Sequence, residues 1–167
     1  MGVTYTQGTD PLRLEPVELS ERLSKVVRGA MPWLATLSED DASYTESENE
    51  WSRKQVIGHL TDSAVNNLGR IVRMQRDADQ YLPGYDQMEW VRAQHYAERD
   101  WAEVLGLWFA LNEHLVWTIA HLERSSLTHR GEVAGSPITL GFLIEDYVAH
   151  MQHHLRAMKG WAEPGLS

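Results

Sequence analysis

Apolar residues recur three and four positions apart in four stretches of this chain, which is the spacing of one face of an α-helix. The first stretch runs from about Pro16 to Leu37 and the second from about Trp51 to Asp77. The third carries its apolar face from Trp101 to Leu122, and the fourth runs from about Pro137, which suits a first helical turn, to Gly160. No stretch sustains the alternation of a half-buried strand. The pattern therefore predicts an all-α protein.

Four amphipathic helices of this length bury their apolar faces best against one another, so the predicted architecture is a four-helix bundle. Residues 1–167 are expected to form one domain, because segments rich in Ser, Asp, Gly and Pro separate the helices and none of them has the length of a linker. Trp101, Trp108 and Trp117 of the third helix are expected to lie in the core, since aromatic side chains bury large apolar areas.

Composition and charge narrow the classes of partner. The 167 residues carry a net charge of −9, which disfavours binding to nucleic acid or to anionic lipid. No apolar run approaches the roughly 20 residues that span a bilayer, and the first residues lack the pattern of a signal peptide, so a cytoplasmic protein is expected. The chain has no cysteine, which excludes thiolate metal sites and a cysteine nucleophile.

The candidate chemistry lies in the segment DYVAHMQHHL, residues 146–155. At about 100° per residue, His154 projects about 50° and His150 about 90° from the centre of the apolar face of the fourth helix, whereas His153 projects about 150° away and should face water. Two histidines one turn apart can bind one metal ion, and imidazole suits Zn, Ni, Cu and Fe. Such a pair can equally form hydrogen bonds within a bundle, and a third ligand would decide between the two.

Five other histidines could supply that ligand. His114 and His121 lie far from the apolar face of the third helix and should be solvated, and His95 and His129 fall in connecting segments. His59 remains, but it projects about 145° from the apolar face of its own helix. It shares this line with five polar residues, which are Asp62, Ser63, Asn66, Arg70 and Arg73. The line either faces solvent or forms the wall of a water-filled cleft, and periodicity does not choose.

Three segments, in this order and spacing, resemble the DinB-like superfamily and especially its YfiT-like metal-dependent hydrolases. They are Trp51 followed by GHLTDS at 58–63 with Asn66 and Arg70, then LPGYDQMEW from Leu82, then TLGFLIEDYVAHMQHHLRAM from Thr139, and the resemblance spans residues 51–160. The resemblance implies a four-helix bundle that binds a divalent metal, commonly Ni or Zn, through one histidine of the second helix and a His-x-x-x-His pair of the fourth. These ligands fall on His59, His150 and His154.

The resemblance also implies two kinds of activity. Relatives include S-transferases and isomerases that use low-molecular-weight thiols such as bacillithiol or mycothiol, and the YfiT-like branch is described as hydrolytic. Three neutral imidazoles leave positions on the metal open for water or thiol, which is typical of a catalytic site. Asp62 is a candidate general base or an acceptor that orients His59, and Asn66 and Arg70 are candidates for binding a substrate carboxylate; all three also suit an exposed polar face.

Two non-catalytic interpretations stay open. The first is a stress-response bundle in which the metal, or the histidines alone, stabilise the fold or bind a small ligand. The second is a bundle that acts through its surface as a homodimer, which is the commonest oligomer of soluble proteins. The enzymatic interpretation expects a small-molecule substrate, and a pocket beside His59 lined by Asn66 and Arg70 would favour it.

Overall fold

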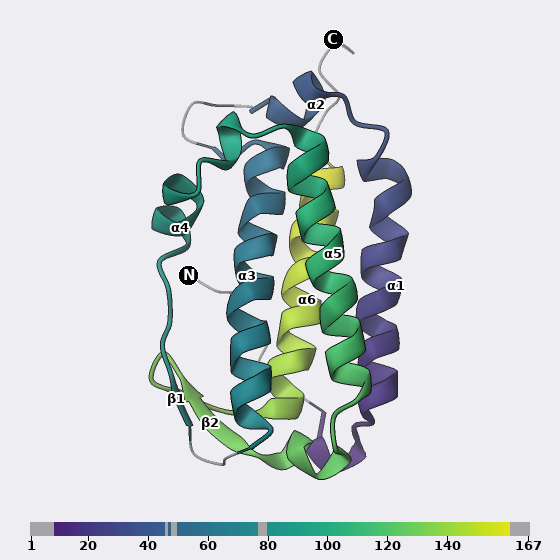
Figure 1. Ribbon diagram of the computed structural model, residues 1–167, viewed down its shortest axis with the longest axis vertical. Coiled ribbons are helices and arrows are strands. Elements are labelled where there is room, and N and C mark those ends of the chain that lie inside the picture. The colour runs from purple at the N-terminus through teal and green to yellow at the C-terminus, as the bar shows by residue number, and fades with distance from the viewer. Residues whose placement is uncertain (1–8, 46, 48–49, 77–79, 161–167) are drawn as a thin grey trace.

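Four long helices form the bundle in the computed structural model, which describes residues 9–45, 47, 50–76 and 80–160 (Figure 1). They are α1 (Pro16–Leu34), α3 (Arg53–Met74), α5 (Trp101–Ala120) and α6 (Leu140–Lys159). Each coincides with one predicted apolar stretch, and one continuous core of buried apolar side chains joins all four. The four-helix bundle is thereby confirmed. The ends of the predicted single domain, residues 1–8 and 161–167, lie outside the described residues.

The arrangement of the helices brings the start of α3 beside the end of α6. Both α1 and α3 pack against α5 and α6 (Figure 1). Helices α1 and α3 therefore lie diagonally opposite one another, although α3 is the next long helix after α1 along the chain. Because α3 runs down the bundle in Figure 1 and α6 runs up it, the first turns of α3 and the last turns of α6 meet at the same end. No described helix is long and apolar enough to cross a membrane.

Side-chain caps fix where the two helices of this pair begin. The Ser52 hydroxyl accepts a hydrogen bond from the Gln55 amide, and the Gln55 side chain accepts one from the Ser52 amide, which is a complete capping box before α3. Thr139 caps α6 by accepting from the Phe142 amide at 3.2 Å. A short helix, α2 (Glu39–Ser43), lies in the segment expected to be a loop.

A small three-stranded sheet closes the other end of the bundle, and the hydrophobic pattern did not predict it. Strand β1 (Gln80–Leu82) pairs in parallel with β2 (Arg130–Val133), which pairs antiparallel with β3 (Ser136–Thr139). Ala134 and Gly135 form the turn between β2 and β3 with φ of 50° and 84°, as a two-residue hairpin requires. Strands of three or four residues are too short to show a period.

The sheet corrects the predicted start of the fourth helix. Pro137 lies in β3 opposite Glu132, and the helix begins three residues later at Leu140. Because β3 is an edge strand in the order β1-β2-β3, a residue without an amide hydrogen is tolerated there. A second prediction was also wrong, because Trp117 is 65% exposed on the outer face of α5, whereas Trp101 and Trp108 are buried as expected.

An outer layer covers the side of α3 that faces away from the rest of the bundle. It consists of α4 (Gln87–Ala93) and a 3₁₀ turn, η2 (Tyr96–Glu98), both of which contact α3 (Figure 1). The Tyr96 ring lies so close to Gly58 that a Cβ atom there would be 2.3 Å from its Cδ2 atom. Only glycine permits this approach. Helix α3 therefore has two buried faces, an apolar face and a polar one. Two further 3₁₀ turns, η1 (Pro11–Arg13) and η3 (Arg124–Thr128), complete the described elements.

Candidate metal centre

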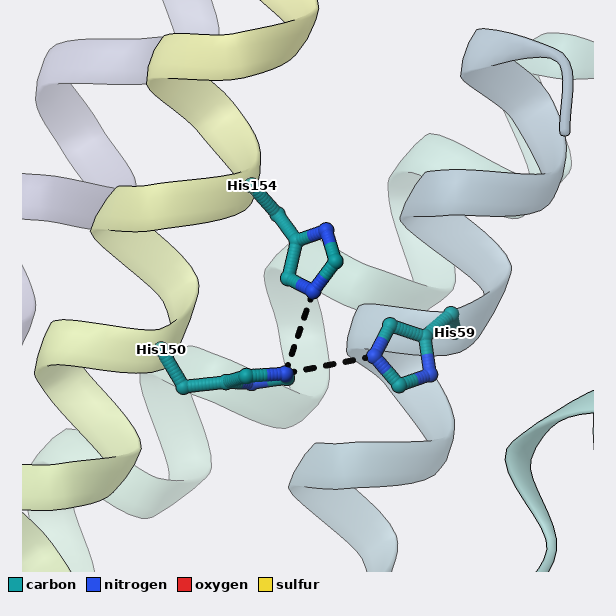
Figure 2. Close-up of side chains that lie close together, drawn as sticks. All are labelled: His59, His150 and His154. Atoms are coloured by element: carbon teal, nitrogen blue, oxygen red, sulfur yellow. Dashed lines mark hydrogen bonds between the residues drawn. The ribbon is translucent and has the colours of Figure 1, made fainter. Parts of the chain in front are cut away.

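Three histidine side chains meet between α3 and α6 (Figure 2). His59 comes from the second turn of α3, and His150 and His154 come from successive turns of α6. The Nε2 atom of His150 lies 3.3 Å from that of His59 and 3.1 Å from that of His154, and all three ligand nitrogens lie within 4.8 Å of one another. The structure therefore brings together the three residues that the family resemblance indicates, and it leaves the neighbouring His153 exposed, as periodicity predicts.

The burial of His59 excludes one of the two alternatives that periodicity left open. Its side chain is only 1% exposed, so the solvent-facing alternative is wrong. The ring packs against Trp51, with 5.2 Å between the ring centroids, and against the edges of the two other histidines. The apolar pattern of α3 could not indicate this burial, because segments distant in the chain cover its polar face.

The surroundings of the three histidines keep them neutral. Burial lowers the pKa of His59 to about 3, and the nearby His150 and His154 lower it further in the same direction. Burial, followed by the neighbouring histidines, lowers the pKa of His150 to about 4, and the same causes lower the pKa of His154. Neutral imidazole is the form that coordinates a metal ion. At neutral pH the three rings are therefore in the form required for coordination.

Hydrogen bonding among the rings does not satisfy the cluster. A neutral imidazole Nε2 atom has either a hydrogen or a lone pair, so the Nε2 atom of His150 cannot donate to one neighbour and accept from the other. A single cation, in contrast, accepts a lone pair from each of the three atoms. Nitrogen ligands about 2.0–2.1 Å from a tetrahedral zinc ion lie about 3.3–3.4 Å apart, which is close to the two spacings measured here. The residues present therefore fit a divalent metal.

The second nitrogen of His59 supports the same assignment. Its Nδ1 atom is buried and has no hydrogen-bond partner among the described residues. When Nε2 of a histidine coordinates a metal, Nδ1 carries the hydrogen and usually donates it to a carboxylate, a carbonyl oxygen or a water. With a metal on Nε2, this Nδ1 atom is a donor for which no described residue supplies an acceptor.

Asp62 lies one turn after His59 on the same buried polar face of α3, and it is 1% exposed. Its Oδ1 atom accepts hydrogen bonds from the Tyr96 hydroxyl at 2.7 Å and from the Gln94 side-chain amide. Its Oδ2 atom is buried without a partner among the described residues. Burial raises the pKa of Asp62, and the two hydrogen bonds oppose that shift. Among the hydrogen bonds of the described residues, none joins Asp62 directly to His59.

No sequence pattern indicated Tyr96 and Gln94 as partners of Asp62, since both lie in a segment without helical periodicity. One signal was available, namely Gly58 in the middle of a predicted helix, because an interior glycine often marks a close approach by another segment. Here the approaching group is the ring of Tyr96, whose hydroxyl reaches Asp62.

The two candidate substrate-binding residues lie further along α3, about 10 Å and about 16 Å beyond His59 at 1.5 Å per residue. The Asn66 amide donates to the Asp62 carbonyl at 2.8 Å. The Arg70 guanidinium donates to the Pro83 carbonyl at 3.0 Å and to the Asn67 side chain at 3.5 Å. Both are half-buried. The groove of about 790 Å³ between α1 and α6 is lined by neither residue and by none of the three histidines.

The remaining histidines lie apart from this cluster. His114 and His121 are exposed on α5, as predicted, and His95 is exposed before η2. The ring of His129 is half-buried, and its Nδ1 atom donates to the Met74 carbonyl at 2.8 Å. None of the four contributes to the group of three ligand atoms.

A family model for the DinB superfamily matches residues 22–158, which include the three histidines, all of α3 and α5, and most of α1 and α6. The chain belongs to the DinB superfamily. Membership in the DinB superfamily agrees with the fold and with the resemblance noted in the sequence.

Two individual proteins are similar to this DinB-superfamily member. A protein from Halalkalibacterium halodurans named "Putative metal-dependent hydrolase BH0277" is 26% identical over 121 residues, which cover 72% of this chain and 70% of that protein. The solved structure described as "YfiT from Bacillus subtilis is a probable metal-dependent hydrolase with an unusual four-helix bundle topology" matches with a TM-score of 0.78 at 18% identity. The match covers 95% of this chain and 94% of the YfiT chain. At that identity the structural match shows the shared fold.

Proposed function

We propose that this protein is a divalent-metal-dependent enzyme in which His59, His150 and His154 hold the ion. One observation carries the proposal: three neutral, largely buried imidazoles point their Nε2 atoms at a common position where hydrogen bonds cannot satisfy all three. The similarity to proteins named as metal-dependent hydrolases supports the same function. A divalent ion bound there supplies Lewis acidity, which lowers the pKa of a coordinated water or thiol and polarises a carbonyl group.

The proposed substrate is a small molecule with a hydrolysable amide or ester bond. Asp62 is proposed to orient His59 through a bridging water, since Oδ2 of Asp62 and Nδ1 of His59 are both buried and unpaired one turn apart. The guanidinium of Arg70 has no carboxylate partner among the described residues, which suits the recognition of an anionic substrate group. Asn66 is proposed to assist Arg70.

Thiol transfer is the alternative reaction of the same site. Because the chain has no cysteine, a thiol would have to be a cosubstrate of low molecular weight. Ni and Zn are the proposed metals, since both accept three imidazole ligands. A location in the cytoplasm and assembly as a homodimer complete the proposal. A non-catalytic bundle that only binds metal is its competitor.

Elemental analysis of tag-free protein is the first test. The wild type is expected to contain nearly one equivalent of Ni or Zn, and His59→Ala, His150→Ala and His154→Ala are each expected to lose it. His153→Ala is the matched control, because His153 lies on the same turn of α6 with an exposed side chain. Metal that is absent from the wild type, even after incubation with Ni or Zn, or that survives all three substitutions would refute the site.

The reaction is tested on protein whose metal content has been established. Hydrolysis of small amides and esters is compared with thiol-dependent consumption of electrophiles, using the three histidine variants as blanks. Asp62→Asn is expected to weaken metal binding by about 10–100-fold, which is usual for a group that orients a ligand. Metal bound at full occupancy without either activity would favour the non-catalytic bundle.

A further inference from the structure

A groove of about 790 Å³ runs between α1 and α6, apart from the candidate metal centre. Its volume lies within the range of about 300–1,000 Å³ that is usual for small-molecule sites. Two half-buried aromatic side chains, Phe142 and Trp33, lie near its opposite ends. Buried apolar side chains from both helices also line it, and they are Leu19, Ala30, Val148 and Leu155. The groove therefore has an apolar floor along most of the length of α6.

Small residues between the two helices leave this space. Helices α1 and α6 run in the same direction in Figure 1, and the ion pair between Arg22 and Glu145, at 3.1 Å, sets their relative level. Gly29 and Ala149 line the groove about one to two turns beyond this pair. Apart from its own helix backbone and its chain neighbours, a Cβ atom added to Gly29 would have no atom within 4 Å. The space beside Gly29 is therefore open.

Charged side chains divide between the two ends of the groove. Near the start of α6, Glu145 is paired with Arg22, and Asp146 adds a second carboxylate. Near the end of α6, Arg156 and Lys159 line the groove about 15 Å or more further along the helix, at 1.5 Å per residue. Neither of these two cations has a carboxylate partner among the described residues. The end of the groove beside the last turn of α6 is therefore positively charged.

Lys25 extends the positive charge toward the middle of the groove. It lies on α1 about one turn beyond Arg22, its side chain is exposed, and no carboxylate of the described residues pairs with it. Basic residues in the last turn of a helix stabilise that helix, which accounts for Arg156 and Lys159 without a ligand. This explanation does not extend to Lys25, which lies in the interior of α1. In a chain with a net charge of −9, three such cations beside one apolar floor indicate a site for an anion.

We propose that this groove binds an amphiphilic carboxylate, a small molecule with an anionic head and an extended apolar chain. The head contacts Arg156 and Lys159, with Lys25 beside it, and the chain lies along the apolar floor toward Phe142. The two carboxylates near the start of α6 repel an anionic head at that end, which fixes the orientation of the ligand. Phe142 and Arg156 are about 21 Å apart along α6, so the floor is long enough for the chain of dodecanoate.

The proposed site is independent of the metal centre. His150 and His154 point from α6 toward α3 in Figure 2, whereas the groove lies on the side of α6 that faces α1. Metal binding therefore does not require the groove to be occupied, and the failure of either proposal leaves the other standing.

Isothermal titration calorimetry of the full chain with dodecanoate, below its critical micelle concentration, tests the proposal. Saturable binding at a single site is expected. Acetate has the anionic head without the chain, and dodecyltrimethylammonium has the same chain with a cationic head. Each is expected to bind at least about tenfold more weakly than dodecanoate, because each loses one of the two sets of contacts.

A charge reversal tests where the anionic head lies. The variant R156E/K159E reverses both cations in the last turn of α6 and is expected to weaken dodecanoate binding by about tenfold or more. The matched control is R73E/R76E, which makes the same change of charge on two exposed residues at the end of α3. This control should bind dodecanoate as the wild type does.

A second substitution tests the apolar floor. Gly29→Leu fills the open space in the groove and should also weaken binding by about tenfold or more, whereas Gly106→Leu, at an equally open and exposed glycine of α5, should not. Both replace a helical glycine with a better helix former, so circular dichroism should show no loss of stability. A wild type that does not bind dodecanoate, or that binds dodecyltrimethylammonium equally well, would overturn the proposal. So would R156E/K159E or Gly29→Leu variants that bind dodecanoate as their controls do.

Discussion

Acidification of the metal-free protein should destabilise it through the histidine cluster, by an amount that follows from the structure. In the unfolded chain His59 and His150 have pKa values of about 6.5, whereas in the folded protein they have values of about 3 and about 4. The unfolded state therefore takes up protons first as the pH falls. Stability conferred by the neutral rings is lost progressively as the pH falls below about 6.5, and the loss continues to about pH 4 for His150 and to about pH 3 for His59.

At pH 5.5 each of these two histidines is mostly protonated in the unfolded state and neutral in the folded state. Each then lowers the free energy of unfolding by about 1.4 kcal/mol relative to pH 7.5, so together they account for about 3 kcal/mol. Because both folded pKa values lie more than one unit below 5.5, this figure depends little on their exact values. A loss of this size is a large share of the stability of a typical domain.

Urea unfolding followed by circular dichroism at pH 7.5 and 5.5, with a chelator present, measures the effect. Carboxylates titrate over part of the same range, so the informative quantity is the difference between the wild type and the double variant H59Q/H150Q. The wild type should lose about 3 kcal/mol more than the double variant. His153→Gln, which alters an exposed ring, should behave as the wild type. Equal losses in the wild type and the double variant would refute the reasoning that burial keeps the two rings neutral.

Two further substitutions test the packing that supports the site. Gly58→Ala places a Cβ atom 2.3 Å from the Tyr96 ring and must displace the Tyr96 hydroxyl from Asp62. We therefore expect the free energy of unfolding to fall by about 2–4 kcal/mol. The double variant G58A/Y96A should recover part of that loss. Tyr147→Phe removes the 2.5 Å hydrogen bond to Asn112 and leaves a buried amide oxygen unpaired, which should cost about 1–3 kcal/mol without altering metal content. Urea titration measures both losses, and an unchanged midpoint in either variant would contradict its expected loss.

The sequence predicted the four bundle helices because each buries one continuous apolar stripe. It failed where burial does not follow a stripe. The polar face of α3 looks exposed by its pattern, but a layer distant in the chain covers it, and hydrogen bonds such as that from Tyr96 to Asp62 offset the cost of burying it. The strands of the sheet are each too short to show a period, and Pro137 resembles the first residue of a helix as much as an edge-strand residue.

Periodicity describes one helix at a time, and this explains which ligands of the candidate metal centre it could indicate. Periodicity placed His150 and His154 together because both lie on one helix, where their spacing fixes their geometry. His59 lies on another helix, and only packing brings it to them, so the sequence indicated it through family resemblance alone. The apolar pattern also placed Trp117 in the core, whereas it is exposed.

The cost of the metal-free site predicts how the stability of the protein responds to an added ion. Without a metal, the three Nε2 atoms lie close together, and Nδ1 of His59 and Oδ2 of Asp62 are buried without partners among the described residues. Each unpaired buried polar atom lowers the stability of the folded protein by about 1–3 kcal/mol. An ion that binds only the folded protein should therefore raise the melting temperature as its concentration increases, and the histidine substitutions should abolish that rise.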